Sequence, residues 1–361
     1  MPDFPDKAFF TQSLLHWHST ENSRELPWKN ETDPYKIWLS EIILQQTRAE
    51  QGLPYYLKFT EAYPTITDLA AAEDEVVFKL WQGLGYYNRC RNMLATARIV
   101  ANDYNGVFPN TYEQILALKG IGPYTAAAIA SFAFKLPHAV VDGNVYRVLS
   151  RCFGIEVSSD STEGKVLFLE LANELLPKGQ SNLFNQAIMD LGATVCTPAA
   201  FKCLECPLAS KCTANSLRRQ SDFPVRSKKV VVKTRYFNYF LFRCGNDVWL
   251  QKRAEGDIWH NLFEPYLVET NEVANLTALL KNEHLSAIDT TKTTLAGKSS
   301  QRLTHRVIEA VFYTVDCATK PTFLPTDGWV NVKDIHKYAF PKTVADFMER
   351  IMGNASAPTL F

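Results

Sequence analysis

Apolar residues recur every three or four positions along the first part of the chain, from Phe9 to about Leu217. This spacing is typical of helices with one buried face, and glycine or proline stands at the breaks between the periodic segments. The pattern therefore predicts a mainly α-helical first part. Helices are expected at Ile37–Thr47, Glu73–Gln82, Asn92–Asn102, Tyr112–Leu118, Tyr124–Phe134, Val145–Cys152, Thr162–Leu176 and Phe184–Leu191.

The pattern changes near Phe223-Pro224-Val225-Arg226, a basic stretch with a proline that is typical of a linker. Beyond it, β-rich segments at 230–242 and 248–252 flank a Cys-Gly-Asn-Asp turn, which predicts a hairpin. A further strand is expected at 307–315, and the helical pattern at 334–352 has Pro341 as an interruption or a helix start. An all-α part therefore precedes a smaller α+β part.

The length of 361 residues favours two or three domains. With 46% hydrophobic and 21% charged residues, the composition is that of a folded soluble protein. No apolar stretch is long enough to span a membrane, and the first residues lack the basic and apolar regions of a signal peptide. We therefore expect a cytoplasmic protein, associated with the nucleoid if it is bacterial.

The formal net charge is zero, which is unusual for a protein that binds nucleic acid. The charge is uneven, however, and between Cys196 and Arg235 only Glu205 and Asp222 oppose the basic residues. Because phosphate binding needs a local basic patch and not a basic average, this segment is a candidate DNA contact. Its basic residues are Lys202, Lys211, Arg218, Arg219, Arg226, Lys228, Lys229, Lys233 and Arg235.

Four of the eight cysteines lie close together as C-x6-C-x2-C-x5-C. Disulfides are rare in a reducing cytosol, so a metal site is indicated. Four thiolates suit a [4Fe–4S] cluster and also tetrahedral zinc, and the spacing leaves both open. The four are Cys196, Cys203, Cys206 and Cys212, whereas Cys90, Cys152, Cys244 and Cys317 are scattered and are expected to be buried free thiols.

A second motif, Leu118-Lys-Gly-Ile-Gly-Pro-Tyr-Thr125, joins an apolar helix to an alanine-rich one. Gly120 and Gly122 allow a tight turn whose backbone N–H groups face outward at a helix N-terminus, which suits a DNA phosphate. An ordinary helix–turn–helix connection explains the same residues.

Glu41 and Asp142 are the candidate reactive carboxyl groups. On a helix, Glu41 shares its face with Ile37, Trp38, Leu44 and Gln45. The loss of water there raises the pKa of Glu41 and favours the protonated acid. Asp142 follows an apolar run and precedes a helix, so it is expected to cap that helix. The helix N-terminus also favours its ionised form. A partly exposed glutamate and a purely structural cap remain the alternatives.

A fourth motif, Trp81-Gln-Gly-Leu-Gly-Tyr-Tyr-Asn-Arg89, combines aromatic residues, glycines and the flanking Arg89 and Arg91. This composition suits a loop that inserts into a base stack. Aromatic packing at a turn between helices is the alternative.

Together these segments resemble the helix-hairpin-helix DNA glycosylases and, among them, the MutY-type adenine glycosylases. They occur in the order of that family over about the first two-thirds of the chain, and the family favours [4Fe–4S] over zinc. The matching segments are Leu26-Pro27-Trp28, Ser40-Glu41, Leu44-Gln45-Gln46-Thr47, Gly83-Leu84-Gly85-Tyr86-Tyr87, Gly120-Ile121-Gly122-Pro123-Tyr124-Thr125, Val141-Asp142-Gly143-Asn144-Val145 and the four cysteines.

The resemblance implies roles in catalysis. Glu41 would protonate N7 of an adenine flipped out of the duplex, and Asp142 would stabilise the positive sugar that develops or its covalent successor. Glu41 would then help to activate water. Tyr124 and Asn144 would help to arrange the site. In the related endonuclease III-type lyases a lysine stands at the position of Tyr124, and since tyrosine forms no Schiff base, base removal without efficient strand cleavage is expected.

The resemblance also implies contacts with double-stranded DNA that contains an adenine mispair. Gly120 and Gly122 belong to the hairpin that grips the phosphate backbone. The adenine pocket would include Arg24 and Trp28, and the residues that fill or probe the gap in the base stack would be Gln46, Leu84 and Tyr86.

The C-terminal part resembles a Nudix-like domain at Gly256-Asp-Ile-Trp-His-Asn-Leu-Phe-Glu-Pro265. The Arg-Glu…Glu-Glu run of active Nudix hydrolases is absent after it, so recognition is expected instead of pyrophosphate hydrolysis. Leu303-Thr304-His305 resembles the family's loop that detects 8-oxoguanine, where many members have Phe-Ser-His. A threonine hydroxyl can still donate and accept a hydrogen bond, and Thr304 and His305 are therefore the expected contacts.

The expected fold is a mainly α helix-hairpin-helix glycosylase followed by a smaller α+β Nudix-like domain. Two other classes remain, a lyase acting on oxidised pyrimidines and a non-catalytic DNA-binding or redox protein. Tyr124 and the extra C-terminal domain disfavour the lyase, and the retained pair Glu41 and Asp142 disfavours the non-catalytic protein. We expect a monomer. The expected parts are a catalytic region at 1–225, a basic linker at 218–232 and the Nudix-like domain at 233–361. Within the catalytic region we expect two lobes. A six-helix lobe spans about 30–136 and contains the hairpin at 118–125, and an iron–sulfur lobe is formed by the N-terminus and about 137–217.

Overall fold

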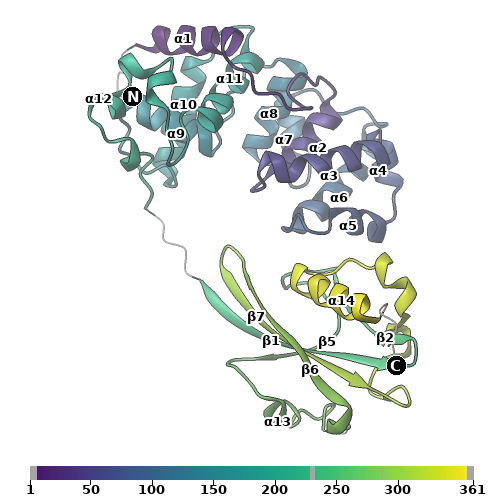
Figure 1. The fold of residues 1–361 in the computed structure, drawn as a ribbon. Coiled ribbons are helices and arrows are strands. Elements are labelled where there is room, and N and C mark those ends of the chain that lie inside the picture. Colours follow the sequence, from purple (N-terminus) through teal and green to yellow (C-terminus); the bar gives the residue numbers. More distant parts are fainter. Residues whose placement is uncertain (1–5, 228–231, 287, 356–361) are drawn as a thin grey trace. The chain divides into compact units, whose positions relative to one another are not determined.

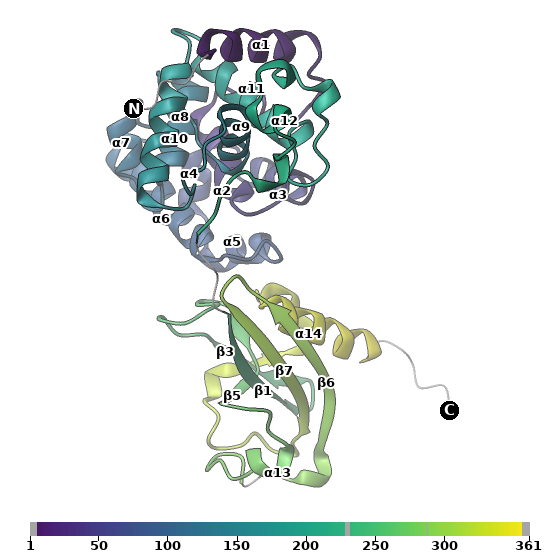
Figure 2. The ribbon, with the colours of Figure 1, turned by 90° about the vertical axis from the view of Figure 1, so that its left-hand side faces the viewer.

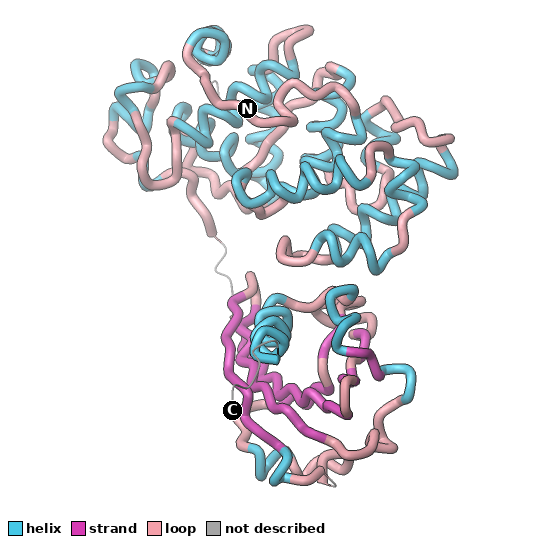
Figure 3. The backbone as a smooth tube through the Cα atoms, turned by 45° about the vertical axis from the view of Figure 1, so that its right-hand side comes forward, coloured by secondary structure: helices cyan, strands magenta, loops and turns pink. Residues whose placement is uncertain are grey.

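The computed structural model describes residues 6–227, 232–286 and 288–355 (Figure 1). Of these, 6–71 and 92–227 form one compact unit, and 72–91 with 232–355 form a second. In Figure 3 the first unit consists of helices and loops, and the strands belong to the second. The expected linker at 218–232 includes residues 228–231, which lie outside the described residues, as does the start of the strand expected from Val230.

Every helix expected from the apolar spacing has a counterpart in the structure. The first unit also has the helices α1, α3, α4 and α12, which the apolar spacing did not predict. The helices of the first unit are α1 (Lys7–Thr20), α2 (Pro34–Leu44), α3 (Ala49–Ala62), α4 (Ile66–Ala71), most of α6 (Asn88–Asp103), α7 (Tyr112–Leu116), α8 (Pro123–Phe134), α9 (Gly143–Phe153), α10 (Thr162–Leu175), α11 (Ser181–Thr194) and α12 (Thr213–Ser216).

Helix α2 is the element that places Glu41. The carboxylate of Asp33 accepts a hydrogen bond from the backbone N–H of Tyr35 at 2.9 Å, which caps the helix, and Pro34 occupies its first turn. From Ile37 to Ile43 every residue is buried, because α2 packs against α8 and α3. A helix that is buried on all sides carries its only carboxyl group into the interior.

In the helical unit, α1, α9, α10 and α11 share a hydrophobic core with large buried residues such as Phe10, Phe168 and Phe184. Cys196 and Cys206 pack against its edge. After α11 the chain forms short 3₁₀ helices, η1 (Cys203–Glu205), η2 (Ala209–Lys211) and η3 (Gln220–Asp222). The cysteine loop therefore follows α11 and packs against a core that includes α9, and both helices line the pocket described below.

The turn between α7 and α8 confirms the expected helical hairpin. Gly120 has φ +76°, and a Cβ there would lie 2.5 Å from the Cβ of Asn92. Gly122 precedes Pro123 at the start of α8, and a Cβ at Gly122 would meet nothing within 4 Å. The two glycines thus differ, since only at Gly120 do the backbone conformation and a close neighbour disfavour a side chain.

The second unit contains a six-stranded sheet in the order β6-β7-β1-β2-β8, in which β5 also pairs with β1. β1 and β7 run parallel, and the other pairs are antiparallel. The expected turn from Cys244 to Asp247 joins β1 to β2, whereas the polar edge strand β6 was not expected. The strands are β1 (Lys233–Cys244), β2 (Asp247–Trp249), β3 (Gln251–Lys252), β4 (Phe263–Glu264), β5 (Tyr266–Thr270), β6 (Thr293–Arg302), β7 (Arg306–Asp316) and β8 (Trp329–Asn331).

Both faces of this sheet are apolar and covered. Phe237, Tyr239 and Leu241 of β1 lie in one core with α14 (Lys342–Ala355), which runs along the sheet in Figure 2. Their alternate neighbours Phe240 and Phe242 lie in a second core with α13 (Leu276–Leu279). This is the period-two pattern of a strand buried on both faces.

The helical pattern at 334–352 divides into η6 (Val332–Lys337) and α14, and Pro341 stands directly before α14 as a helix start. The expectation for the scattered cysteines holds in part: Cys90 and Cys152 are buried, but Cys244 and Cys317 are half-buried. No helix in the described part of the chain is both long and apolar enough to cross a membrane.

Segment 72–91 contains α5 (Asp74–Trp81) and belongs to the second unit. The Nζ of Lys79 donates to the carbonyl of Tyr338 at 2.9 Å, and the Nζ of Lys252 donates to Glu75 at 2.8 Å. Arg91 donates to the carbonyl of His260 at 2.9 Å. These contacts fix the loop after α5, including Tyr86, within this unit.

The two glycines of the hairpin make a matched test. Gly120→Ala should lower the free energy of unfolding by about 1–2 kcal/mol, because alanine disfavours this backbone conformation and its methyl group would clash with Asn92. Gly122→Ala should leave stability nearly unchanged. Urea unfolding of both variants checks this, and equal stabilities would contradict the structural difference between the two positions.

Candidate active site

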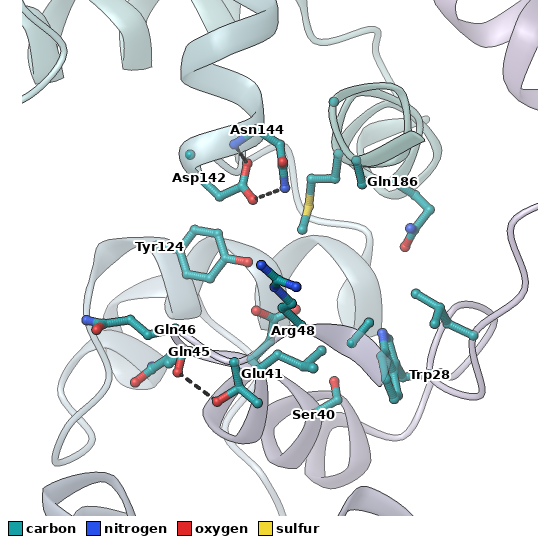
Figure 4. A pocket seen from close by; sticks show the side chains of 18 of the residues that line it. Trp28, Ser40, Glu41, Gln45, Gln46, Arg48, Tyr124, Asp142, Asn144 and Gln186 are labelled. Carbon is teal, nitrogen blue, oxygen red and sulfur yellow. Dashed lines mark hydrogen bonds between the residues drawn. The ribbon is translucent and has the colours of Figure 1, made fainter. Parts of the chain in front are cut away.

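A cavity of about 680 Å³ opens in the helical unit, lined by residues from the N-terminal loop, α2, the loop after α2, and the starts of α8 and α9 (Figure 4). Helix α11 closes one side. Seven of the residues expected from the sequence line this cavity. They are Arg24, Trp28, Glu41, Gln46, Tyr124, Asp142 and Asn144.

Glu41 projects from buried helix α2 and is 8% exposed. Burial raises the pKa of its carboxyl group to about 7, the charge of Asp142 acts in the same direction, and a hydrogen bond with Tyr124 opposes the rise. At neutral pH a substantial fraction of Glu41 is therefore protonated and can act as an acid.

Asp142 caps α9, as its sequence position predicts. Its Oδ1 accepts hydrogen bonds from the backbone N–H groups of Asn144 and Val145, both at 2.8 Å, and its Oδ2 accepts one from the Asn144 side chain at 2.7 Å. Burial raises the pKa of Asp142 above its ordinary value, but these donors and the charge of Arg147 oppose the rise. The helix N-terminus thus stabilises a carboxylate at the cavity wall.

Tyr124 lies in the first turn of α8, directly after Pro123. Burial, together with the charges of Glu41 and Asp142, raises the pKa of its hydroxyl well above the ordinary value. The hydroxyl therefore stays protonated and serves as a hydrogen-bond donor to Glu41. No lysine occurs among the described residues that line the cavity.

Arg24 and Trp28 reach the cavity through a loop that a buried carboxylate holds. Asp190 of α11 is fully buried and accepts from Arg24 Nη1 at 2.9 Å and from Asn22 at 2.8 Å, and Lys29 Nζ lies 3.1 Å away. Lys29 also donates to the carbonyl of Arg24 at 2.7 Å. A single carboxylate thus fixes three side chains of the N-terminal loop against α11.

Arg147 was not among the expected site residues. Its guanidinium donates to the Asn144 side-chain oxygen at 2.7 Å, to the carbonyl of Gly192 at 2.8 Å and to the carbonyl of Cys196 at 2.7 Å. It therefore joins the cap of α9 to the end of α11 and to the first cysteine of the loop. Its place one turn after Asn144, on a buried helix face, was the available sequence signal.

The residues expected to probe the base stack take different positions. Gln46 is exposed at the cavity, with φ +57°, a conformation that non-glycine residues adopt at a cost. Leu84 is only 5% exposed. Tyr86 is 47% exposed with φ +47°, and its hydroxyl lies 2.6 Å from that of Thr304.

Thr304 and His305 are exposed at the turn between β6 and β7. The backbone N–H of Leu303 donates to the carbonyl of Arg306 at 2.7 Å, which closes the turn, and the carbonyl of His305 accepts from the N–H of Lys233 at 3.1 Å. The hydrogen bond between Tyr86 and Thr304 brings together two motifs that stand 218 positions apart in the sequence.

The four clustered cysteines line one small cavity with Arg151, Phe201 and Gln220. Arg151 Nη1 lies 3.4 Å from the Sγ of Cys196, and Gln220 donates to the Sγ of Cys203 at 3.6 Å. Within the described residues, no three His, Cys, Asp or Glu side chains are grouped so that they could hold one metal ion. The four cysteines nevertheless line one cavity, and thiolates are ligands of zinc as well as of iron–sulfur clusters.

Comparison with known proteins decides the family. Residues 39–173 match the model described as HhH-GPD superfamily base excision DNA repair protein, and 238–350 match that of the NUDIX domain. An adenine DNA glycosylase of Buchnera aphidicola subsp. Schizaphis graminum is 31% identical over 350 residues, which cover 94% of this chain and 98% of the relative. The chain belongs to the adenine DNA glycosylases. It is thus a base-excision repair enzyme that hydrolyses N-glycosyl bonds.

Other adenine DNA glycosylases match more locally. That of Rattus norvegicus is 42% identical over 222 residues, which cover 59% of this chain and 43% of the relative. Among solved structures, a thermostable thymine-DNA glycosylase has a TM-score of 0.55 and 32% identity, over 59% of this chain and 97% of that one. A trapped endonuclease III–DNA covalent intermediate has a TM-score of 0.52 at 20% identity, over 60% of this chain and 99% of that one, which shows the shared fold.

The Asp190 contacts predict a stability difference between two ion pairs of the N-terminal segment. Asp190→Asn should lower the free energy of unfolding by about 3 kcal/mol, because Arg24 and Lys29 would lose a buried counterion. The control Glu174→Gln removes the exposed pair with Lys7 and should cost less than about 1 kcal/mol. Equal effects in thermal unfolding would contradict the structural importance of Asp190.

Proposed function

We propose that this adenine DNA glycosylase excises adenine paired with 8-oxoguanine or guanine and leaves the DNA strand intact. The observation that supports the proposal best is the pair of carboxyl groups in one cavity, Glu41 with a pKa of about 7 and Asp142 at a helix N-terminus. The substrate is double-stranded DNA, from which the adenine is flipped into the cavity.

In the proposed reaction Glu41 donates its proton to N7 of the adenine. The bond between C1′ and N9 then breaks, its electron pair stays with the base, and positive charge develops on the sugar. Asp142 stabilises that charge, and Asn144 and Arg147 hold Asp142 in place. Water attacks C1′, and the ionised Glu41 takes up its proton, which restores the acid for the next cycle.

Tyr124 supports base removal without lyase chemistry. A lyase of this fold needs an amine that forms a Schiff base with the opened sugar. The Tyr124 hydroxyl cannot form one, and the described residues that line the cavity offer no lysine in its place. The proposed product is therefore an abasic site in an uncut strand.

The proposed contact with the opposite base lies at Thr304 and His305. Both are exposed, and the Thr304 hydroxyl is bonded to Tyr86, which is proposed to enter the base stack. A threonine hydroxyl offers one donor and two acceptor positions, so Thr304 can still address the base opposite the adenine while it contacts Tyr86. DNA phosphates are proposed to bind at the turn of Gly120 and Gly122.

The pH dependence tests Glu41. Because burial raises its pKa to about 7 and the protonated form is the reactive one, the single-turnover rate should be high below pH 7 and fall about tenfold per pH unit above it. Glu41→Gln should bind mispaired DNA and lose base release by at least about a hundredfold. The exposed Glu61→Gln on α3 is the control and should behave as wild type. Near-normal excision by Glu41→Gln would exclude the assignment.

We also propose that Cys196, Cys203, Cys206 and Cys212 hold a [4Fe–4S] cluster. Such a group would fasten the loop that carries Lys202 and Lys211 to the end of α11, where basic residues can meet DNA phosphates. The cysteines line one cavity, and Arg151 Nη1 donates a hydrogen bond to the Sγ of Cys196.

Metal analysis tests the cluster. The purified protein should be yellow-brown and contain iron and acid-labile sulfide in equal amounts, and Cys203→Ser should lose both together with DNA affinity. Cys90→Ser, a change at a buried thiol outside the loop, should keep the iron. A colourless, zinc-loaded and active wild-type protein would contradict the proposal.

A further inference from the structure

The turn between β6 and β7 is attached to a second loop by an ion pair. Arg306, the residue directly after His305, places its Nη1 3.3 Å from Oδ1 of Asp257. Asp257 lies between β3 and β4, in the loop 253–262. Of the ion pairs formed by described residues, this is the only one that Arg306 makes. A side-chain contact therefore joins the turn of Thr304 and His305 to a loop 49 positions earlier.

Asp257 is itself fixed from several directions. Its oxygens accept from Arg235 Nη2 at 2.7 Å, from Arg253 Nη2 at 2.7 Å and from the backbone N–H of Ile258 at 2.7 Å. Arg235 also binds Glu269, with its Nε 2.6 Å from Oε1. These contacts hold the carboxylate in one orientation toward Arg306.

The base of this network is buried. The Arg253 and Glu264 side chains are 6% and 4% exposed, and they form an ion pair with each other. Glu264 also accepts a hydrogen bond from the hydroxyl of Tyr239 at 3.1 Å. Although burial acts to raise it, Arg235 and Arg253 keep the pKa of Asp257 well below its ordinary value. The carboxylate is therefore ionised at neutral pH.

In the turn between β6 and β7, the backbone hydrogen bonds do not by themselves fix the orientation of the side chains, so side-chain contacts such as the Arg306–Asp257 ion pair must do so. Hydrogen bonds close the turn at Leu303 and fix His305 to β1, but they involve only main-chain atoms. Leu303 packs against the same core as Ile258 and Trp259 of the Asp257 loop. Asp257 thus holds the base of the turn on one side, and Tyr86 meets Thr304 at its tip.

We propose that Asp257 is a positioning residue which, through Arg306, sets the direction of Thr304 and His305 and so the preference for 8-oxoguanine over guanine opposite the adenine. This inference rests on the proposed function. A residue at that turn needs a fixed geometry, because a small displacement weakens discrimination between two bases that differ by few atoms.

The experiment compares single-turnover rates of adenine release opposite 8-oxoguanine and opposite guanine in the full-length protein. Asp257→Asn should lower the ratio of the two rates at least about fivefold, mainly by slowing release opposite 8-oxoguanine. The matched control is Asp316→Asn, which breaks the exposed pair with Arg243 at the other end of β7 and should keep the wild-type ratio. A wild-type ratio near one would refute the proposed lesion preference itself, before any variant is compared.

A second variant separates positioning from folding. Arg306→Met removes the link and leaves Asp257 bound to Arg235 and Arg253, so it should lower the ratio as Asp257→Asn does. The double variant should lower it no further. Overturning results would be an unchanged ratio in Arg306→Met, a proportional loss of both rates, or additive effects in the double variant, since these indicate a structural role or a direct phosphate contact of Arg306.

Discussion

Two carboxyl groups share one cavity, and the proposed chemistry depends on their different environments. Burial raises the pKa of each. Glu41 lies in the middle of a fully buried helix, where the Tyr124 hydroxyl is the main group that favours its charge, and its pKa reaches about 7. Asp142 instead receives three hydrogen bonds at the start of α9, so its carboxylate is stabilised in place. One group is thus available as an acid and the other as a counter-charge.

Other residues of the helical unit hold the two carboxyl groups and the cavity wall in place. Arg147 binds Asn144, which binds Asp142, and its other donors hold the end of α11 and the carbonyl of Cys196. Asp190 on α11 binds Arg24 and so holds the loop that carries Arg24 and Trp28 at the cavity. Leaving a buried charge such as that of Arg147 or Asp190 without a partner would lower the free energy of unfolding, so these contacts favour one position for the helices that they join.

The sequence predicts what local rules decide. The spacing of apolar residues predicted the helices, the apolar run before Asp142 predicted the cap of α9, and Gly120 and Gly122 predicted the hairpin. Each of these features depends on neighbours within a few residues. Strand β6 was not expected, since its polar residues show no buried face and its pairing with β7 decides its structure. Asp190, Arg147 and Asp257 act through partners distant in sequence. Long-range contacts determine the roles of these three residues, and the spacing of apolar residues along the chain does not reveal such contacts.

The most direct measurement uses a labelled duplex with one adenine opposite 8-oxoguanine. After incubation with the protein, half of the sample is treated with alkali, and both halves are separated by length. Strand cleavage only after alkali is the expected result, because adenine would be released without a Schiff base. Cleavage without alkali would contradict the role given to Tyr124, and tight binding with no cleavage in either half would contradict catalysis by Glu41 and Asp142.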